Sequence, residues 1–195
     1  IAHNLKASKE QILDDLKGFM SPLQRRMLKE LLQHLDELNV HIENLNDEID
    51  NFMKPEEKQA SQVIQDVTGI GNTSAQTIIA VIGTDMERFP SDRHISSWAG
   101  LCPGDNVSAK KRKSGKIRKG NALLKSTLVL CAHAAVRHKS SYFHAQFKRI
   151  STHRGKKRAY VAVAHSILIA IYHILKDGVK YQDLGAEYYN QFNAE

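Results

Sequence analysis

Cysteine is scarce in this chain, which has only Cys102 and Cys131 among its 195 residues. One chance pair makes no disulfide framework and is compatible with a reducing cytoplasm. No Cys and His residues occur at the spacing of a zinc site, and the ten histidines are scattered along the sequence. We therefore expect no metal site in this chain and interpret the histidines as surface or core residues.

Long apolar runs are also lacking. None approaches the ~18–20 residues that a helix needs to span a bilayer. The start of the chain has neither an initiator methionine nor the basic and then apolar pattern of a signal peptide. We therefore expect a cytoplasmic protein with no membrane contact, and we interpret the chain as the middle of a longer protein.

Acidic residues are few in the second part of the chain. Residues 1–66 contain 8 Lys/Arg and 13 Asp/Glu, whereas residues 67–195 contain 20 Lys/Arg and 8 Asp/Glu. The net charge of +7 thus combines −5 in the first part with +12 in the second. This division suggests that only the second part meets a polyanion.

Residues 28–52 carry a regular apolar stripe. Its members alternate spacings of three and four residues, and mainly Asp, Glu, Asn, His and Gln separate them, which is typical of a heptad seam. Such a seam buries itself against another helix, so we expect a coiled coil between molecules or domains. A helix predicted over residues 5–19 is another candidate partner, and a hairpin within one chain is the alternative. Pro55 ends the seam, which comprises Leu28, Leu31, Leu35, Leu38, Ile42, Leu45, Ile49 and Phe52.

The sequence predicts an all-α fold in two parts. Residues 1–62 form coiled-coil and linker helices, and residues 63–195 form a helical domain. Trp98 is expected to be a core anchor. Residues 159–175 lack charges and are long enough for the central helix, so we interpret them as buried in the core. Further helices are predicted over residues 91–101, 122–138 and 141–150.

The motif Gly69-Ile70-Gly71 lies between two helical patterns and resembles a helix-hairpin-helix. Its glycines permit a tight turn and a close approach of backbone N–H groups to a phosphate. Gly69 and Gly71 are therefore candidate DNA-backbone contacts. A helix–turn–helix corner that packs without touching DNA is the alternative.

Residues 110–119 form the most basic segment, in which seven of ten residues are Lys or Arg and none is acidic. A loop this basic repels itself unless an anion neutralises it, and nucleic-acid phosphates fit best. A solvated loop is the alternative. A second basic cluster comprises Arg154, Lys156, Lys157 and Arg158.

Two serines, Ser108 and Ser114, lie in or beside this basic segment. A free serine is a poor nucleophile, but neighbouring cations stabilise charge on an attacked phosphate and hold the scissile bond in place. A serine here is therefore a candidate nucleophile on a phosphodiester. Metal-dependent phosphoryl transfer needs clustered carboxylates, and residues 67–195 offer few.

The order of Gly69-Ile70-Gly71, Phe89-Pro90-Ser91, Trp98 to Pro103, Ser108 and Gly115 to Asn121 resembles a known domain. It is similar to the C-terminal, serine-bearing transposase domain of a bacterial insertion-sequence family. That family also has a RuvC-like DEDD domain, and it includes relatives of the Piv invertase and the bridge-RNA-guided recombinases. The resemblance covers about residues 63–178, and the heptad segment resembles the coiled coil that joins the two domains.

The resemblance implies transposition or site-specific recombination through a serine that forms a covalent link to DNA. Ser108 matches the serine after the Gly-Leu-x-Pro signature, although Ala109 follows it where the family usually has glycine. Ser114, which precedes Gly115, is the second candidate. The implied DNA-binding residues are Gly69, Gly71, Lys110, Lys111, Arg112, Lys113, Lys116, Arg118, Lys119 and Asn121.

The resemblance further implies Mg²⁺ held by four carboxylates of the RuvC-like domain. No such domain is recognisable in this sequence, so we expect a catalytically incomplete fragment that still binds DNA. The expected partners are DNA, a second copy of the chain through the coiled coil and, as a further candidate, a guide RNA, all in the bacterial cytoplasm. The alternatives are a non-catalytic DNA-binding or architectural module and a coiled-coil scaffold that binds no nucleic acid.

Overall fold

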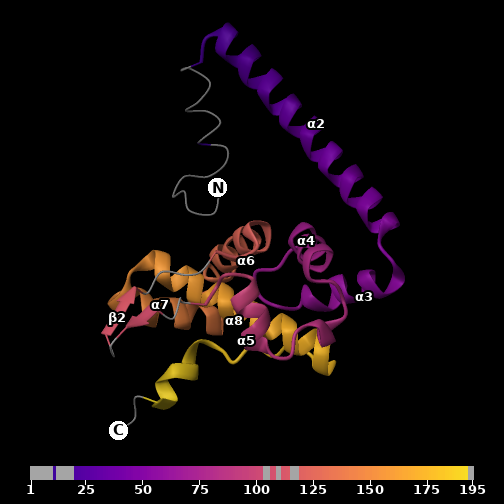
Figure 1. Cartoon of the computed structure of the whole chain (residues 1–195). Coiled ribbons are helices and arrows are strands. Elements are labelled where there is room, and N and C mark those ends of the chain that lie inside the picture. Colours follow the sequence, from indigo (N-terminus) through magenta and orange to yellow (C-terminus); the bar gives the residue numbers. More distant parts are fainter. Residues whose placement is uncertain (1–10, 12–19, 103–105, 109–110, 115–118, 193–195) are drawn as a thin grey trace. The chain divides into compact units, whose positions relative to one another are not determined.

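The structure, a computed structural model, describes residues 11, 20–102, 106–108, 111–114 and 119–192 (Figure 1). The helix predicted over residues 5–19 thus falls almost entirely outside the described residues. Contacts along the chain separate two units, Ile1–Ile49 and Asp50–Glu195.

The start of the second unit differs from the predicted boundary between residues 62 and 63. The reason is α3 (Pro55–Ile64), which the sequence had grouped with the linker helices. Ala60 and Ile64 of this helix are part of the hydrophobic core of the second unit. A short helix that starts with a proline therefore belongs to the compact helical unit.

The long helix α2 (Pro22–Phe52) contains the predicted heptad seam. Its start is a reciprocal cap, in which the Gln24 amide donates to Ser21 Oγ at 3.3 Å and the Ser21 amide donates to Gln24 Oε1 at 2.8 Å. The helix ends at Phe52, three residues before Pro55, which agrees with the prediction that this proline ends the seam. None of its residues is buried, and every seam residue is exposed. The apolar seam therefore has no cover within the described residues.

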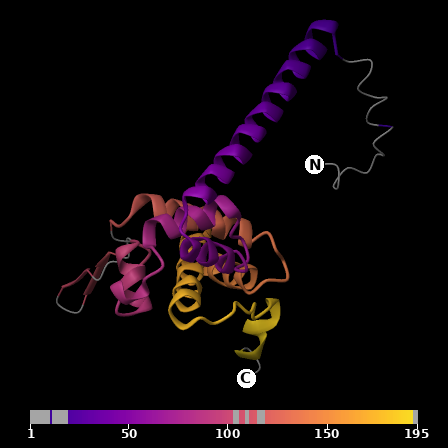
Figure 2. The same cartoon turned by 90° about the vertical axis from the view of Figure 1, so that its right-hand side faces the viewer.

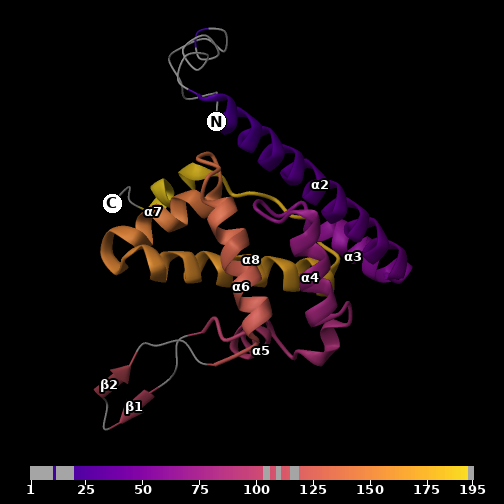
Figure 3. The same ribbon diagram turned by 90° about the horizontal axis from the view of Figure 1, so that it is seen from above.

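The core of the second unit is built around α8 (Lys156–Asp177). Eight of its residues are buried, and Val163, Ala164, Ile167, Leu168 and Ile171 recur at the three- and four-residue spacing of helix positions that face a core. It packs against α6 (Ala122–Ala135), α7 (Tyr142–Arg154) and α5 (Asp92–Trp98). Figure 3 shows α6 crossing α8. The prediction of a buried central helix is confirmed.

By length and mean hydropathy, α8 is also the one helix among the described residues that is apolar enough to cross a membrane. This differs from the expectation that no segment approaches that length. The explanation is its position, since a helix surrounded by three others is apolar on nearly all sides. We interpret α8 as the core helix of the unit.

The corner between α3 and α4 (Asn72–Ile82) contains the two glycines of the predicted hairpin. Gly69 has φ +95°, and a Cβ atom there would lie 2.5 Å from the Cys131 carbonyl oxygen and 2.6 Å from the Ala135 amide nitrogen. The backbone of α6 therefore packs directly onto Gly69. Gly71 is the N-cap of α4, and a Cβ atom there would meet nothing within 4 Å.

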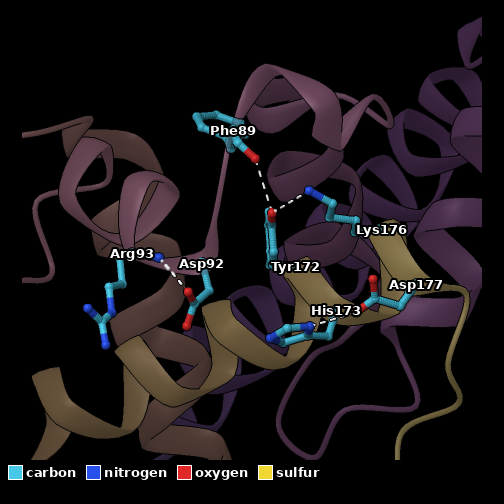
Figure 4. A network of polar contacts seen from close by, with 7 residues as sticks. All are labelled: Phe89, Asp92, Arg93, Tyr172, His173, Lys176 and Asp177. Carbon is cyan, nitrogen blue, oxygen red and sulfur yellow. Dashed lines mark hydrogen bonds and ion pairs between the residues drawn. The ribbon is translucent and has the colours of Figure 1, made fainter.

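A polar network fixes the segment before α5 onto α8 (Figure 4). The Tyr172 hydroxyl donates to the Phe89 carbonyl oxygen at 3.0 Å, and the Lys176 ammonium donates to the same hydroxyl at 3.0 Å. Phe89 in turn packs against Trp98, with ring centroids 5.5 Å apart. Trp98 is nevertheless 41% exposed, so the prediction of a core anchor is wrong. The indole covers the edge of the core instead of filling it.

The C-terminal segment packs on α7 through Asp183. Its carboxylate accepts from the amides of Tyr142 and Gly185, each at 2.8 Å, and from the hydroxyls of Tyr181 and Thr68. Burial acts to raise the pKa of Asp183, but these four hydrogen bonds outweigh it and hold the pKa below its usual value. The 3₁₀ segment η3 (Ala186–Phe192) follows, and it packs against α7.

Candidate nucleic-acid interface

The predicted basic loop contains two short antiparallel strands, β1 (Asn106–Ser108) and β2 (Lys111–Ser114). Figures 2 and 3 show this hairpin standing away from the helices. The fold is therefore helical, as predicted, with one added hairpin that the sequence did not indicate. Lysine-rich segments have low strand propensity, so local sequence gave no sign of the pairing.

The register of the hairpin separates the two candidate serines. Ser108 pairs with Lys111 at one end of the paired strands, whereas Ser114 pairs with Asn106 at the other end. They lie about two residues, or roughly 7 Å, apart along the strand direction. Val107 pairs with Arg112, which leaves Lys113 as the extra residue of a β-bulge. The structure thus places Ser108 directly opposite a lysine of the basic strand.

The two ends of the hairpin segment meet at the helical unit. Leu101 is buried, and Gly120 packs so closely on the backbone of Ala99 and Gly100 that a Cβ atom there would clash with both residues. The Asn121 amide also donates to the Trp98 carbonyl oxygen at 3.4 Å. The segment therefore leaves and re-enters the helical unit at one place.

Asn121, a predicted DNA contact, has a structural role in this arrangement. Its side-chain oxygen accepts from the Leu124 amide at 2.9 Å and caps the start of α6. Gly69 likewise has a structural role, because α6 occupies the space beside its Cα atom. Of the two glycines in the predicted helix-hairpin-helix, only Gly71 has open space beside it.

The predicted basic residues fall into four groups. Lys110, Lys116 and Arg118 lie outside the described residues, while Lys111, Arg112 and Lys113 belong to β2. Lys119 is exposed just before α6. The second cluster surrounds Gly155 at the corner between α7 and α8, where all four of its side chains are exposed. The strands pack mainly against each other, so hairpin and corner are two separate basic segments. The corner residues are Arg154, Lys156, Lys157 and Arg158.

No three His, Cys, Asp or Glu side chains converge as metal ligands within the part of the chain that the structure describes. The described residues therefore do not provide the set of carboxylates that would hold the Mg²⁺ implied by the resemblance. We assign no chemical step of this chain to it.

Comparison with known proteins supports the resemblance. Residues 61–148 match the model of the Transposase IS116/IS110/IS902 family. The chain is 32% identical over 108 residues to the transposase for insertion sequence element IS1111A of Coxiella burnetii, a match that covers 53% of this chain and 29% of that protein. It is 28% identical over 135 residues to the insertion element IS110 uncharacterized 43.6 kDa protein of Streptomyces coelicolor, covering 65% of this chain and 31% of that protein.

The matched region of each relative is thus about a third of its length. The family match starts within α3 and ends within α7, so it includes the glycine corner, the hairpin and α6. The segment that carries the basic hairpin and its serines is therefore similar to transposases of the IS116/IS110/IS902 family.

Proposed function

We propose that this chain is part of a transposase or site-specific recombinase and that its second unit, Asp50–Glu195, binds DNA. Three observations support this proposal: the match to transposases, the charge of +12 on residues 67–195, and the projecting basic hairpin. DNA carries one negative charge per about 1.7 Å of duplex, so a strand of lysines and arginines gains affinity by releasing its counterions.

Within this unit, we propose that Ser108 is the nucleophile. The observation that supports the assignment is its register position opposite Lys111, at the end of the paired strands away from Ser114. A phosphate held by the hairpin cations would lie near this position. Ser114, by contrast, pairs with Asn106 at the end nearer the helical unit. Cations near an attacked phosphate stabilise the charge that develops on its oxygens.

The proposed reaction exchanges one phosphoester for another. Ser108 Oγ forms a bond to phosphorus, and the bond from phosphorus to one sugar oxygen breaks. The hydroxyl proton leaves to water or to a base of the assembled complex, and the departing sugar oxygen takes up a proton. The phosphodiester is retained in the protein–DNA link, so a later attack by a DNA hydroxyl rejoins a strand and releases the serine.

A substitution of the serine in the full-length protein tests this proposal. Ser108→Ala should bind DNA as the parent does and form no covalent adduct on denaturing gels. Ser114→Ala is the matched control, since it removes a hydroxyl from the other end of the hairpin and should keep the adduct. An undiminished adduct with Ser108→Ala would reject the assignment. A parent protein that binds DNA but forms no adduct would favour the non-catalytic architectural module.

We also propose that α2 pairs with a second copy of the chain. The support is its uninterrupted seam, in which residues from Leu28 to Phe52 stay exposed, Phe52 to 89%. An exposed apolar stripe of this length carries a large hydrophobic cost in water. The seam variant Leu35→Asp/Ile42→Asp should convert a dimer to a monomer in light scattering, whereas Glu43→Ala on the polar face should not. A dimer that persists in the seam variant would contradict the pairing.

A further inference from the structure

A groove between α7 and η3 is lined by cations that no basic run in the sequence indicated. It has a volume of about 680 Å³ and lies on the second unit. Its wall on α7 includes Lys148, Arg149, Thr152 and His153, which repeat at the spacing of one helix face. Lys139, His144 and Glu187 also line it.

The second wall of the groove is held in place by aromatic contacts. The Tyr189 hydroxyl donates to the Tyr142 hydroxyl at 2.9 Å, and the two rings stack with centroids 5.5 Å apart. The Arg149 guanidinium lies 4.8 Å from the centroid of the Tyr189 ring. This cation–π contact orients the Arg149 guanidinium at the Tyr189 ring. The groove is therefore a fixed feature of the fold with an oriented cation at its edge.

The described lining of the groove carries more cations than carboxylates. The lining holds Lys139, Lys148 and Arg149 against a single carboxylate, that of Glu187. Lys139 and Lys148 are both exposed. Like charges gathered in one groove repel each other and attract an anion from solution.

We propose that this groove binds the phosphodiester backbone of a nucleic-acid strand, as a contact separate from the hairpin. The open groove suits a polymer that passes along it. Residues 148–153 of α7 extend about 7.5 Å at 1.5 Å per residue. That length spans roughly two phosphates of one strand at 3.4 Å each along a duplex. The inference rests on the proposed function, because the charge, the hairpin and the similarity to transposases favour a nucleic acid over an acidic protein.

A salt titration of binding tests the groove. Lys139→Ala/Lys148→Ala should lower the affinity for a labelled DNA duplex or a structured RNA, measured by fluorescence anisotropy. The slope of log Kobs against log salt should decrease in magnitude by about 1 to 2, because one or two phosphate contacts are lost. Both lysines are exposed, so the melting temperature should not change. The substrate with the larger loss identifies the strand that occupies the groove.

The matched control is Arg93→Ala/Lys180→Ala, which removes two exposed cations from outside the groove and leaves the same net charge. If the groove variant binds both substrates as this control does, the groove proposal is overturned. A hairpin variant, Lys111→Ala/Lys113→Ala, separates the two proposals. Loss of binding in the hairpin variant alone overturns only the groove, whereas a parent chain that binds no nucleic acid overturns the proposed function as well.

Discussion

Two long helices of this chain carry apolar stripes, and within the described residues one of them is covered and the other is exposed. α8 has eight buried residues beneath α5, α6 and α7, whereas α2 has none. Their sequence patterns differ in width, since α2 has a narrow seam between polar residues and α8 is apolar on most sides. The difference teaches that the wide apolar surface of α8 is buried within its own unit, while the narrow seam of α2 stays exposed within the described residues.

The largest expected effect comes from truncating one leucine in each of the two helices and comparing the losses in stability. Leu168→Ala in α8 removes a fully buried side chain, so it should lower the free energy of unfolding of the second unit by roughly 2–5 kcal/mol. Leu35→Ala in α2 removes the same atoms from an exposed position and should change that free energy by no more than about 0.5 kcal/mol. Urea unfolding followed by circular dichroism measures both. Equal losses would mean that α2 is part of the cooperative core.

A second prediction concerns the helix that covers α8. Gly69→Ala would force a Cβ atom onto the backbone of α6 and would hold alanine at positive φ. We expect a loss of roughly 2–4 kcal/mol in unfolding free energy from strain and overpacking. Gly71→Ala meets no neighbouring atom and should cost about 1 kcal/mol or less, as an N-cap substitution. Similar losses at both positions would show that α6 moves aside easily.

The smallest expected effect concerns the C-terminal segment, which Asp183 attaches to α7. Because its pKa is lowered by folding, its contribution is present above the ordinary carboxylate pKa. That contribution is lost as pH falls through the lowered value. The protection factors of the η3 amides, which correct the exchange rates for their intrinsic pH dependence, should therefore fall on acidification, and Asp183→Asn should show low protection already at neutral pH. Asp177→Asn, which breaks only a contact within one helix turn, is the control. Exchange that is equal in both variants would contradict the attachment.

Helices with strong local patterns were predictable from the sequence. The seam of α2, its end before Pro55 and the buried α8 all followed from apolar spacing and one proline. The roles of individual residues depended on partners far along the chain. Gly69 packs against Cys131 and Ala135, and no property of the segment around Gly69 reveals that contact. Trp98 was misplaced for the same reason, since an apolar spacing does not show which side of a short helix is covered.

The candidate site was predictable where its chemistry is continuous in sequence. The run of Lys and Arg around Ser114 and the cluster at Gly155 stand out without a structure. The groove on α7 does not, because Lys139 and Lys148 are separated by a helix start, and Tyr189 joins them only through tertiary packing. Asn121 shows the opposite case, since a polar residue in a basic segment proved to be a helix cap.

The junction at Gly100 and Gly120 has a consequence for how such proteins diversify. The segment between Gly100 and Gly120 has both ends packed together at the helical unit, so its length can change without moving the helices. Doubling the length of a flexible loop costs only about 0.6 kcal/mol in closure entropy, so insertions between the two glycines should leave the helices unaffected. A longer or different segment could then replace this one on the same helices, provided that both glycines are kept.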